Sequence, residues 1–252
     1  MKQNIIPCLD IRNGRVVKGK KFRDVQDVAD PVALAQQYEA DQADVLFLLD
    51  IAGDDRTLFL QVIKQIRKET ALPLYIGGGI RSVKAIEETL EAGADKVSIT
   101  SAAITQPGFL KEAVSAFGGE RIILSIDAQE VSPGTWHAFI SGGKQDTGIN
   151  AIEWARQGET LGVSEILLNS IDADGVKGGY NIPLHQAIRK QVTIPIIASG
   201  GAGDVEDFQT VLTTGKADAA LAASVFHYGD ILISDVKKAL NNVNKDKYEG
   251  ES

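Results

Sequence analysis

The hydrophobic residues of this chain fall into two kinds of segment that alternate from one end to the other. Short runs rich in isoleucine, valine and leucine are typical of buried strands. They occupy residues 5–9, 45–50, 74–77, 96–100, 122–127, 165–169, 196–199 and 219–222. Stretches with the period of amphipathic helices lie at residues 31–42, 58–68, 83–91, 108–117, 152–161, 184–190, 205–213 and 231–242. Eight strands alternating with eight helices favour an α/β fold of the (β/α)8 TIM barrel type over an open doubly wound sheet, which usually has about five or six strands.

The second half of the chain repeats the first. The segment PLYIGGG, which begins at Pro73, returns as PIIASGG at Pro195, an offset of 122 residues (195 − 73). The Ala-Asp pair that ends at Asp95 has its counterpart ending at Asp218. Such an echo indicates an internal duplication. We therefore expect a single barrel domain over residues 1–252 with a twofold half-barrel repeat, at about 1–120 and 121–243, and a polar, frayed tail at 244–252.

Glycines follow two of the predicted strands and precede helices, one group in each half. Glycine lets the backbone N–H groups approach a phosphate closely, and a serine after the next strand of each half adds a hydroxyl donor. The residues concerned are Gly78, Gly79 and Ser101 in one half and Gly200, Gly201 and Ser224 in the other. A single glycine pair is more often a tight turn, but the repetition favours two phosphate sites.

Two aspartates end predicted strands on opposite sides of the barrel. Asp10 ends the first apolar run and Asp127 ends the fifth. Barrel enzymes carry their catalytic groups at this end of the strands, and two facing carboxylates can divide acid and base work if one pKa is raised. The alternative is a carboxylate that caps a neighbouring loop, a role that Asp50 fits equally well. Polar, glycine-rich segments at 13–30, 53–57, 130–148 and 173–180 are expected to form the loops around these residues.

The composition narrows the choice of ligand. A formal net charge of −8 and a pI near 5.0 argue against nucleic acid and anionic membranes as partners. The single cysteine, Cys8, excludes an internal disulfide, and the histidines at 137, 185 and 227 are scattered, so we expect no metal site. Lys18 follows the first strand and can neutralise a substrate or steady a carboxylate. Because no apolar run reaches the length of a membrane span, we expect a cytoplasmic protein.

Taken together, these segments resemble the cyclase subunit of imidazole glycerol phosphate synthase, an enzyme of histidine biosynthesis. The likeness covers nearly the whole chain. It rests on IIPCLD from Ile5, GRVVKG from Gly14, GGGI from Gly77, ADKVS from Ala94, SIDA from Ser125, IASGGAG from Ile197 and LAASVFH from Leu221. The resemblance implies a substrate with a phosphate at each end, a ribulosyl phosphate joined through a formimino link to an aminoimidazole carboxamide ribotide. It implies no metal and no organic cofactor.

The resemblance also implies roles for individual residues. Asp10 and Asp127 match the acid–base pair of the family, and Lys18 and Asn169 match polar residues of the substrate cavity. One phosphate site corresponds to Gly79, Thr100 and Ser101, and the other to Asp174, Gly201, Ala223 and Ser224. Thr100 stands where the family usually has asparagine, and this change is expected to weaken substrate binding.

A partner is implied as well. In this family a glutaminase binds the N-terminal face of the barrel and its ammonia travels through the barrel core. Asp95, Lys96 and Glu165 match family positions on that face. Asn4 stands in place of the usual arginine and Val45 in place of the usual glutamate. The charged ring at the ammonia entrance is therefore expected to lack two of its charges, and the coupling to the glutaminase is expected to be looser.

Three other interpretations remain open at this point. The sister isomerase of the same pathway shares the two-phosphate architecture, but PCLD with VKG favours the cyclase. A paralogue that supplies ammonia for amidating a surface sugar would not need both Asp10 and Asp127. The changes at Asn4, Val45 and Thr100 leave open a third interpretation, a non-catalytic barrel that only binds an amidotransferase.

Overall fold

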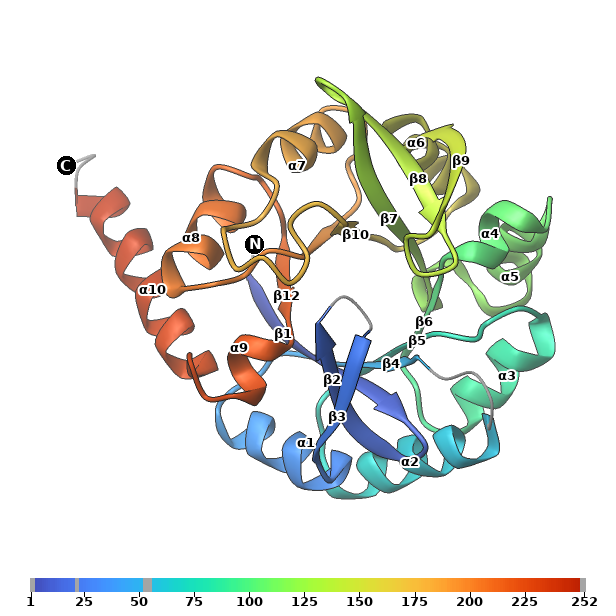
Figure 1. The fold of residues 1–252 in the computed structure, drawn as a ribbon, viewed down its shortest axis with the longest axis horizontal. Helices are drawn as coiled ribbons and strands as arrows, with labels where there is room; N and C mark the ends of the chain where they lie inside the picture. Colours follow the sequence, from blue (N-terminus) through green and yellow to red (C-terminus); the bar gives the residue numbers. More distant parts are fainter. Residues whose placement is uncertain (1–2, 21–22, 52–55, 250–252) are drawn as a thin grey trace.

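Eight parallel strands form a closed barrel in the computed structural model, which describes residues 3–20, 23–51 and 56–249. In order around the barrel they are β1 (Asn4–Arg12), β4 (Leu46–Asp50), β5 (Leu74–Gly77), β6 (Lys96–Ile99), β7 (Ile122–Ser132), β10 (Glu165–Ser170), β11 (Ile196–Ser199) and β12 (Ala219–Ala222). Each strand pairs in parallel with the next, and β12 pairs with β1 to close the ring. Figure 1 shows this barrel with helices around it. The predicted (β/α)8 fold is confirmed.

Helices cover the outside of the barrel. They are α1 (Pro31–Ala40), α2 (Arg56–Glu69), α3 (Val83–Glu91), α5 (Phe109–Phe117), α6 (Ala151–Leu161), α7 (Ile182–Arg189), α8 (Val205–Thr213) and α10 (Ile233–Glu249). Local signals start several of them: the Asp30 carboxylate accepts from the N–H groups of Val32 and Ala33, and Asp204 and Asp207 form a reciprocal capping box. Large apolar clusters fill the space between strands and helices. No helix among the described residues is long and apolar enough to cross a membrane.

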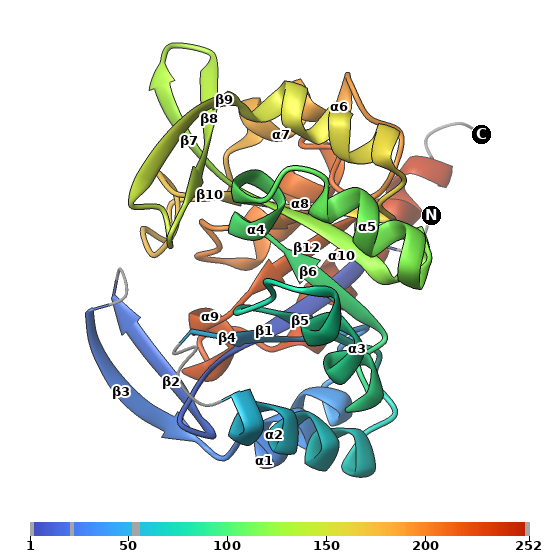
Figure 2. The same cartoon turned by 90° about the vertical axis from the view of Figure 1, so that its right-hand side faces the viewer.

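Several short elements were not predicted. Residues 13–30 and 130–148 were expected to be loops, yet they contain β2 (Arg15–Lys20), β3 (Arg23–Ala29), β8 (Thr135–Ile140) and β9 (Gln145–Asn150). Figure 2 shows the two antiparallel extensions projecting beyond the same end of the barrel. The loop prediction was wrong because β1 and β7 continue past the barrel rim and pair with the returning chain, so the extensions depend on backbone pairing more than on a continuous apolar face.

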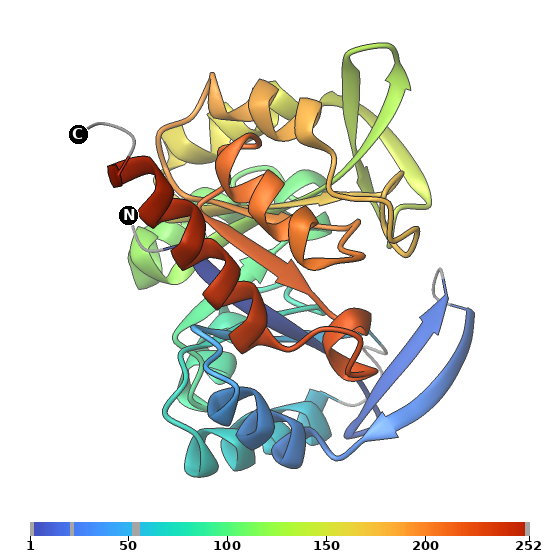
Figure 3. The same ribbon diagram turned by 90° about the vertical axis from the view of Figure 1, so that its left-hand side faces the viewer.

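Helix boundaries differ as well. The short helices α4 (Ser101–Thr105) and α9 (Ser224–His227) and the 3-10 turn η1 (Gly119–Arg121) were missed because each is too short to show a hydrophobic period. The last helix was expected to end near residue 242, but α10 continues to Glu249, as Figure 3 shows along the side of the barrel. The backbone of residues 244–249 is therefore helical.

Apolar side chains line the interior of the barrel. Strand residues alternate between the inside and the outside of a barrel. The inward-facing cluster comprises Ile6, Cys8, Val45, Phe47, Tyr75, Ile123, Leu167, Ile197, Ala219 and Leu221. All of these residues are buried, Cys8 included. The barrel interior is therefore a packed and mostly apolar core, and by the same alternation the buried side chains of Ser98 and Ser125 face it as well.

An arginine in each half ties helix ends to the start of a strand. Arg67 donates to the carbonyl oxygens of Leu72 and Gly93 and to Asp95 Oδ2, which also accepts from the Leu74 N–H group.

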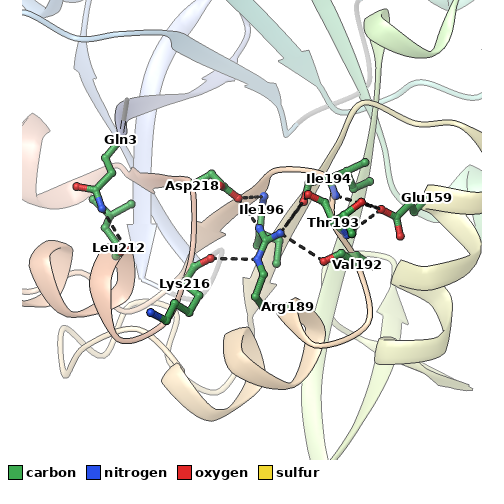
Figure 4. Close-up of polar contacts among 10 residues, drawn as sticks. All are labelled: Gln3, Glu159, Arg189, Val192, Thr193, Ile194, Ile196, Leu212, Lys216 and Asp218. Atoms are coloured by element: carbon green, nitrogen blue, oxygen red, sulfur yellow. Dashed lines mark hydrogen bonds and ion pairs between the residues drawn. The ribbon is translucent and has the colours of Figure 1, made fainter. Parts of the chain in front are cut away.

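In the second half, 122 residues later, Arg189 binds the Asp218 carboxylate, which accepts from the Ile196 N–H group. Arg189 also donates to four backbone carbonyls, those of Val192, Thr193, Ile194 and Lys216. Figure 4 shows this cluster. The same contacts recur in both halves, as expected of a duplicated half-barrel.

Candidate active site

Asp10 and Asp127 lie on opposite sides of the barrel, near the points where the parallel pairing of their strands stops at the C-terminal rim. Three strands separate β1 from β7 in each direction around the ring. Both residues are partly exposed. The Cys8 thiol lies 3.9 Å from Asp10 Oδ1 on the same strand. Both residues were predicted to end their strands, but β1 continues past Asp10 to Arg12 and β7 past Asp127 to Ser132, because each strand goes on to pair with a hairpin beyond the rim.

The environment of Asp127 raises its pKa. The main cause is burial of the carboxyl group, which disfavours its charged form, and the Asp174 carboxylate nearby adds to the effect. Asn169 opposes it by donating from Nδ2 to Asp127 Oδ1 at 3.1 Å. Asn169 is the direct neighbour of Asp127 on the adjacent strand β10. Asn169, Asp174 and Asp127 therefore form one group at this side of the rim.

The first glycine group occupies the turn after β5. Gly78 and Gly79 have φ angles of +87° and +65°. A Cβ atom on Gly78 would lie 2.2 Å from the backbone oxygen of Asp50, so only glycine fits. Thr100 precedes α4 with φ −112° and ψ −94°, and Ser101 starts that helix. The Ser101 hydroxyl accepts from the Ser141 N–H group at 3.2 Å.

The second glycine group repeats this arrangement after β11. Gly200 and Gly201 have φ angles of +83° and +119°. A Cβ atom on Gly200 would lie 2.7 Å from the backbone oxygen of Ser170, the counterpart of the Asp50 contact. Ala223 precedes α9 with φ −121° and ψ −75°, close to the conformation of Thr100, and Ser224 starts the helix. Neither α4 nor α9 has a side-chain hydrogen bond at its N-cap.

The glycine conformations therefore satisfy the turn interpretation whether or not a ligand binds. The glycine turn, the N-cap conformation and the serine recur together in both halves, and this joint repetition favours two anion sites. Lys18 lies in β2, where its backbone pairs with Gln26 across the hairpin. Its side chain lies outside the part of the chain that the structure describes.

The residues assigned to the N-terminal face lie in three different places. Asn4 and Glu165 line a cavity of about 140 Å³, and Lys96 forms an ion pair with Glu165. Val45 is only 3% exposed and belongs to the cluster inside the barrel. Asp95 lies at the outer edge, bound to Arg67. The structure thus brings Asn4, Lys96 and Glu165 to one mouth of the barrel but not Val45 or Asp95.

Tyr75, which lines the same cavity, was missed by reasoning from the sequence. Its hydroxyl donates to Glu165 Oε1 at 3.3 Å, and Lys96 Nζ lies 5.3 Å from the centre of its ring. A signal was present, because Tyr75 in PLYIGGG corresponds to Ile197 in PIIASGG. An aromatic residue that breaks an otherwise apolar repeat is a reason to consider the position.

Within the described residues, no three or more His, Cys, Asp or Glu side chains are grouped so that they could hold a metal ion. The three histidines lie apart. His137 contacts Asp146 on a hairpin, and the Nδ1 atom of His227 lies 2.6 Å from the Tyr38 hydroxyl. His185 is completely buried in α7, and neither ring nitrogen has a hydrogen-bond partner.

Comparison with known proteins places the chain in a family. The family model of the histidine biosynthesis proteins matches residues 4–232. The imidazole glycerol phosphate synthase subunit HisF of Oceanobacillus iheyensis is 54% identical over 243 residues, which cover 96% of this chain and 95% of that protein. The HisF subunit of Nocardia farcinica is 48% identical, covering 94% and 95% of the two chains, and that of Corynebacterium diphtheriae is 47% identical, covering 93% of each. The chain therefore belongs to the histidine biosynthesis protein family, among the cyclase subunits of imidazole glycerol phosphate synthase.

Proposed function

We propose that this cyclase uses ammonia from a partner glutaminase to convert the phosphoribulosyl-formimino aminoimidazole carboxamide ribotide into imidazole glycerol phosphate and aminoimidazole carboxamide ribotide. The observation that carries the proposal is the placement of Asp10 and Asp127 at the same rim of the barrel, on strands that lie opposite each other in the ring. The two repeated glycine turns belong to the strands between them. A substrate with a phosphate at each end fits this symmetry.

The phosphates would be held by backbone N–H groups and hydroxyls. Gly78, Gly79, Thr100 and Ser101 are proposed for one phosphate, and Gly200, Gly201, Ala223 and Ser224, with Asp174 beside them, for the other. Turns of this kind present N–H groups to an anion without lysine or arginine, which suits a protein with a net charge of −8. Lys18 is proposed as an additional cation on the hairpin over the rim.

The two aspartates would divide the proton transfers. Burial and the neighbouring Asp174 raise the pKa of Asp127, which supports Asp127 as the carboxyl group that donates a proton. Asp10 then takes the proton that the attacking nitrogen loses when it adds to the ribulosyl carbonyl. Asn169 is proposed to hold the Asp127 carboxyl in position.

Ammonia would reach this site through the barrel. The interior between the N-terminal mouth and Asp10 is mostly apolar, with the buried hydroxyls of Ser98 and Ser125 among its groups, so a neutral molecule crosses it far more readily than a cation. The mouth itself carries Asn4, Lys96 and Glu165, with Asp95 at its outer edge. We propose this face as the surface that the glutaminase covers.

The experiment that tests the proposed reaction is turnover by the purified chain with an ammonium salt and no glutaminase. Asp10→Asn and Asp127→Asn should each lower kcat by about 100-fold or more, because each removes a general acid or base. Asp235→Asn, an exposed aspartate paired with Lys238 on α10, is the matched control and should leave kcat unchanged. Binding without turnover by the unmodified chain would contradict the proposal and favour a non-catalytic barrel.

A further inference from the structure

One side chain at the N-terminal mouth breaks the twofold repeat of the barrel. Tyr75 on β5 and its counterpart Ile197 on β11 both line the cavity of about 140 Å³. Ile197 contributes only apolar surface. Tyr75 contributes an aromatic ring and a hydroxyl group, so the two halves of the mouth differ in shape and in chemistry.

Two neighbours hold the Tyr75 side chain, Glu165 at its hydroxyl group and Lys96 over the face of its ring. Its hydroxyl donates to Glu165 Oε1 at 3.3 Å, across the barrel from β5 to β10. Glu165 is also the ion-pair partner of Lys96, whose ammonium group lies 5.3 Å from the centre of the Tyr75 ring. Lys96 in turn lies beside Tyr75 on the neighbouring strand and donates to Ser164 Oγ at 3.2 Å. Three side chains from three strands therefore hold one another.

The ring lies at the boundary between the mouth and the barrel interior. Tyr75 is 9% exposed and belongs to the inward-facing cluster, where it lies beside Phe47 on the adjacent strand β4. It also lines the mouth cavity, as do Ile6, Ile197 and Ala219 of the same cluster. Val45, in the same cluster, contributes no charge to the mouth. Among the four residues that the cavity and the cluster share, Tyr75 has the largest side chain and the only aromatic ring, so its ring is the bulkiest of the groups between the mouth and the interior.

We propose that Tyr75 is the gate residue of this barrel: its ring separates the mouth cavity from the apolar interior, and Glu165 and Lys96 hold it closed. The inference rests on the proposed function, in which ammonia enters at this mouth. Tyr75 is not a catalytic residue, because it lies at the opposite end of the barrel from the two aspartates. A partner that draws Lys96 or Glu165 away releases the hydroxyl and lets the ring turn. Burial and Glu165 raise the pKa of Tyr75, so its hydroxyl remains a neutral donor.

The test uses the complex with the glutaminase, supplied with amide-15N glutamine in a buffer that contains unlabelled ammonium. Two quantities are measured: the share of 15N in imidazole glycerol phosphate, and the product formed per glutamine hydrolysed. Tyr75→Leu keeps an apolar side chain but removes the ring and the hydroxyl. We expect both quantities to fall by about twofold or more, because ammonia that has entered flows back through an open gate. Tyr75→Phe keeps the ring and loses only the hydroxyl, so it should give a smaller fall.

Controls separate the gate from the chemistry. Tyr38→Phe removes another buried tyrosine hydroxyl, one outside the barrel interior, and should leave both quantities unchanged. Turnover at saturating ammonium, which enters at the open rim, should stay within about twofold of the unmodified chain in every Tyr75 variant, because the active site is intact. Unchanged 15N incorporation and stoichiometry in Tyr75→Leu would overturn the gate alone. No ammonium-driven turnover by the unmodified chain would overturn the proposed function and the gate with it.

Discussion

Asn169 and Asp127 lie opposite each other on neighbouring strands, and the Asn169 amide donates to Asp127 Oδ1 at 3.1 Å. This hydrogen bond favours the charged carboxylate and so lowers the pKa of Asp127, against the stronger effect of burial, which raises it. The balance between these two effects decides at which pH Asp127 holds a proton.

Replacing Asn169 should therefore move the pH profile of the cyclase. In Asn169→Leu the donor is gone, the pKa of Asp127 rises further, and the limb of the kcat profile that belongs to Asp127 moves to higher pH by about one unit. The direction is the same whether Asp127 gives or takes a proton. The measurement is ammonium-driven kcat from about pH 5 to 10, a range that spans the neutral region where such limbs fall. A limb that stays in place would show that Asn169 does not set the protonation of Asp127.

His185 should make the protein sensitive to mild acid. Burial lowers its pKa to about 4, below the reference value of about 6.5 expected in the unfolded chain. Between these two values the unfolded state binds more protons than the folded state, so stability is complete above about pH 6.5 and falls as the pH falls toward about 4. The loss at about pH 5 relative to pH 7 should be about 2 kcal/mol.

The variant His185→Leu tests this assignment. It replaces two buried nitrogens that have no partner, and its free energy of unfolding in urea should change less between about pH 7 and pH 5 than that of the unmodified chain. His137→Gln, which removes a histidine at a hairpin surface, should keep the original pH dependence. Equal pH dependence in His185→Leu and the unmodified chain would assign the acid sensitivity to other groups.

The two arginine clusters should differ in their contribution to stability. Arg189→Leu removes the partner of four backbone carbonyls and of Asp218, and should cost about 2–3 kcal/mol in the free energy of unfolding. Arg67→Leu is the same change in the other half. It should cost less, because the Arg67 and Asp95 side chains are 31% and 50% exposed whereas those of Arg189 and Asp218 are 23% and 22% exposed. Urea unfolding of both variants decides the order, and a larger loss in Arg67→Leu would reverse the argument.

The glycine turn after β11 should tolerate no side chain. In Gly200→Ala the added Cβ would lie 2.7 Å from the Ser170 oxygen at a φ of +83°, so we expect a loss of about 2 kcal/mol or more and a raised KM for the substrate. Gly229 has a similar φ of +69° but no neighbouring atom within 4 Å. Gly229→Ala should cost only about 1 kcal/mol and leave KM unchanged. Similar effects on KM in both variants would argue against a phosphate at the Gly200 turn.

Much of the fold could be predicted because it follows from local periodicity. The barrel strands are continuous apolar runs, and each lies within a few residues of its predicted place, as β5 and β11 show. The hairpin strands β2 and β3 escaped prediction because their stability comes from pairing beyond the rim. The repeat of PLYIGGG as PIIASGG was enough to predict the two glycine turns, since both copies place glycines directly after an apolar run.

The sequence by itself determined the order of the barrel strands and the helices that cover them, the twofold repeat and the strands that carry Asp10 and Asp127. Only the tertiary structure decided that Val45 lies inside the barrel and that Tyr75 reaches Glu165, 90 residues away in the chain. The physical reason is that closure of the barrel sets the stagger between strands, and the stagger decides which inward-facing side chains meet across the interior. The pattern of apolar and polar residues along a single strand does not specify that stagger.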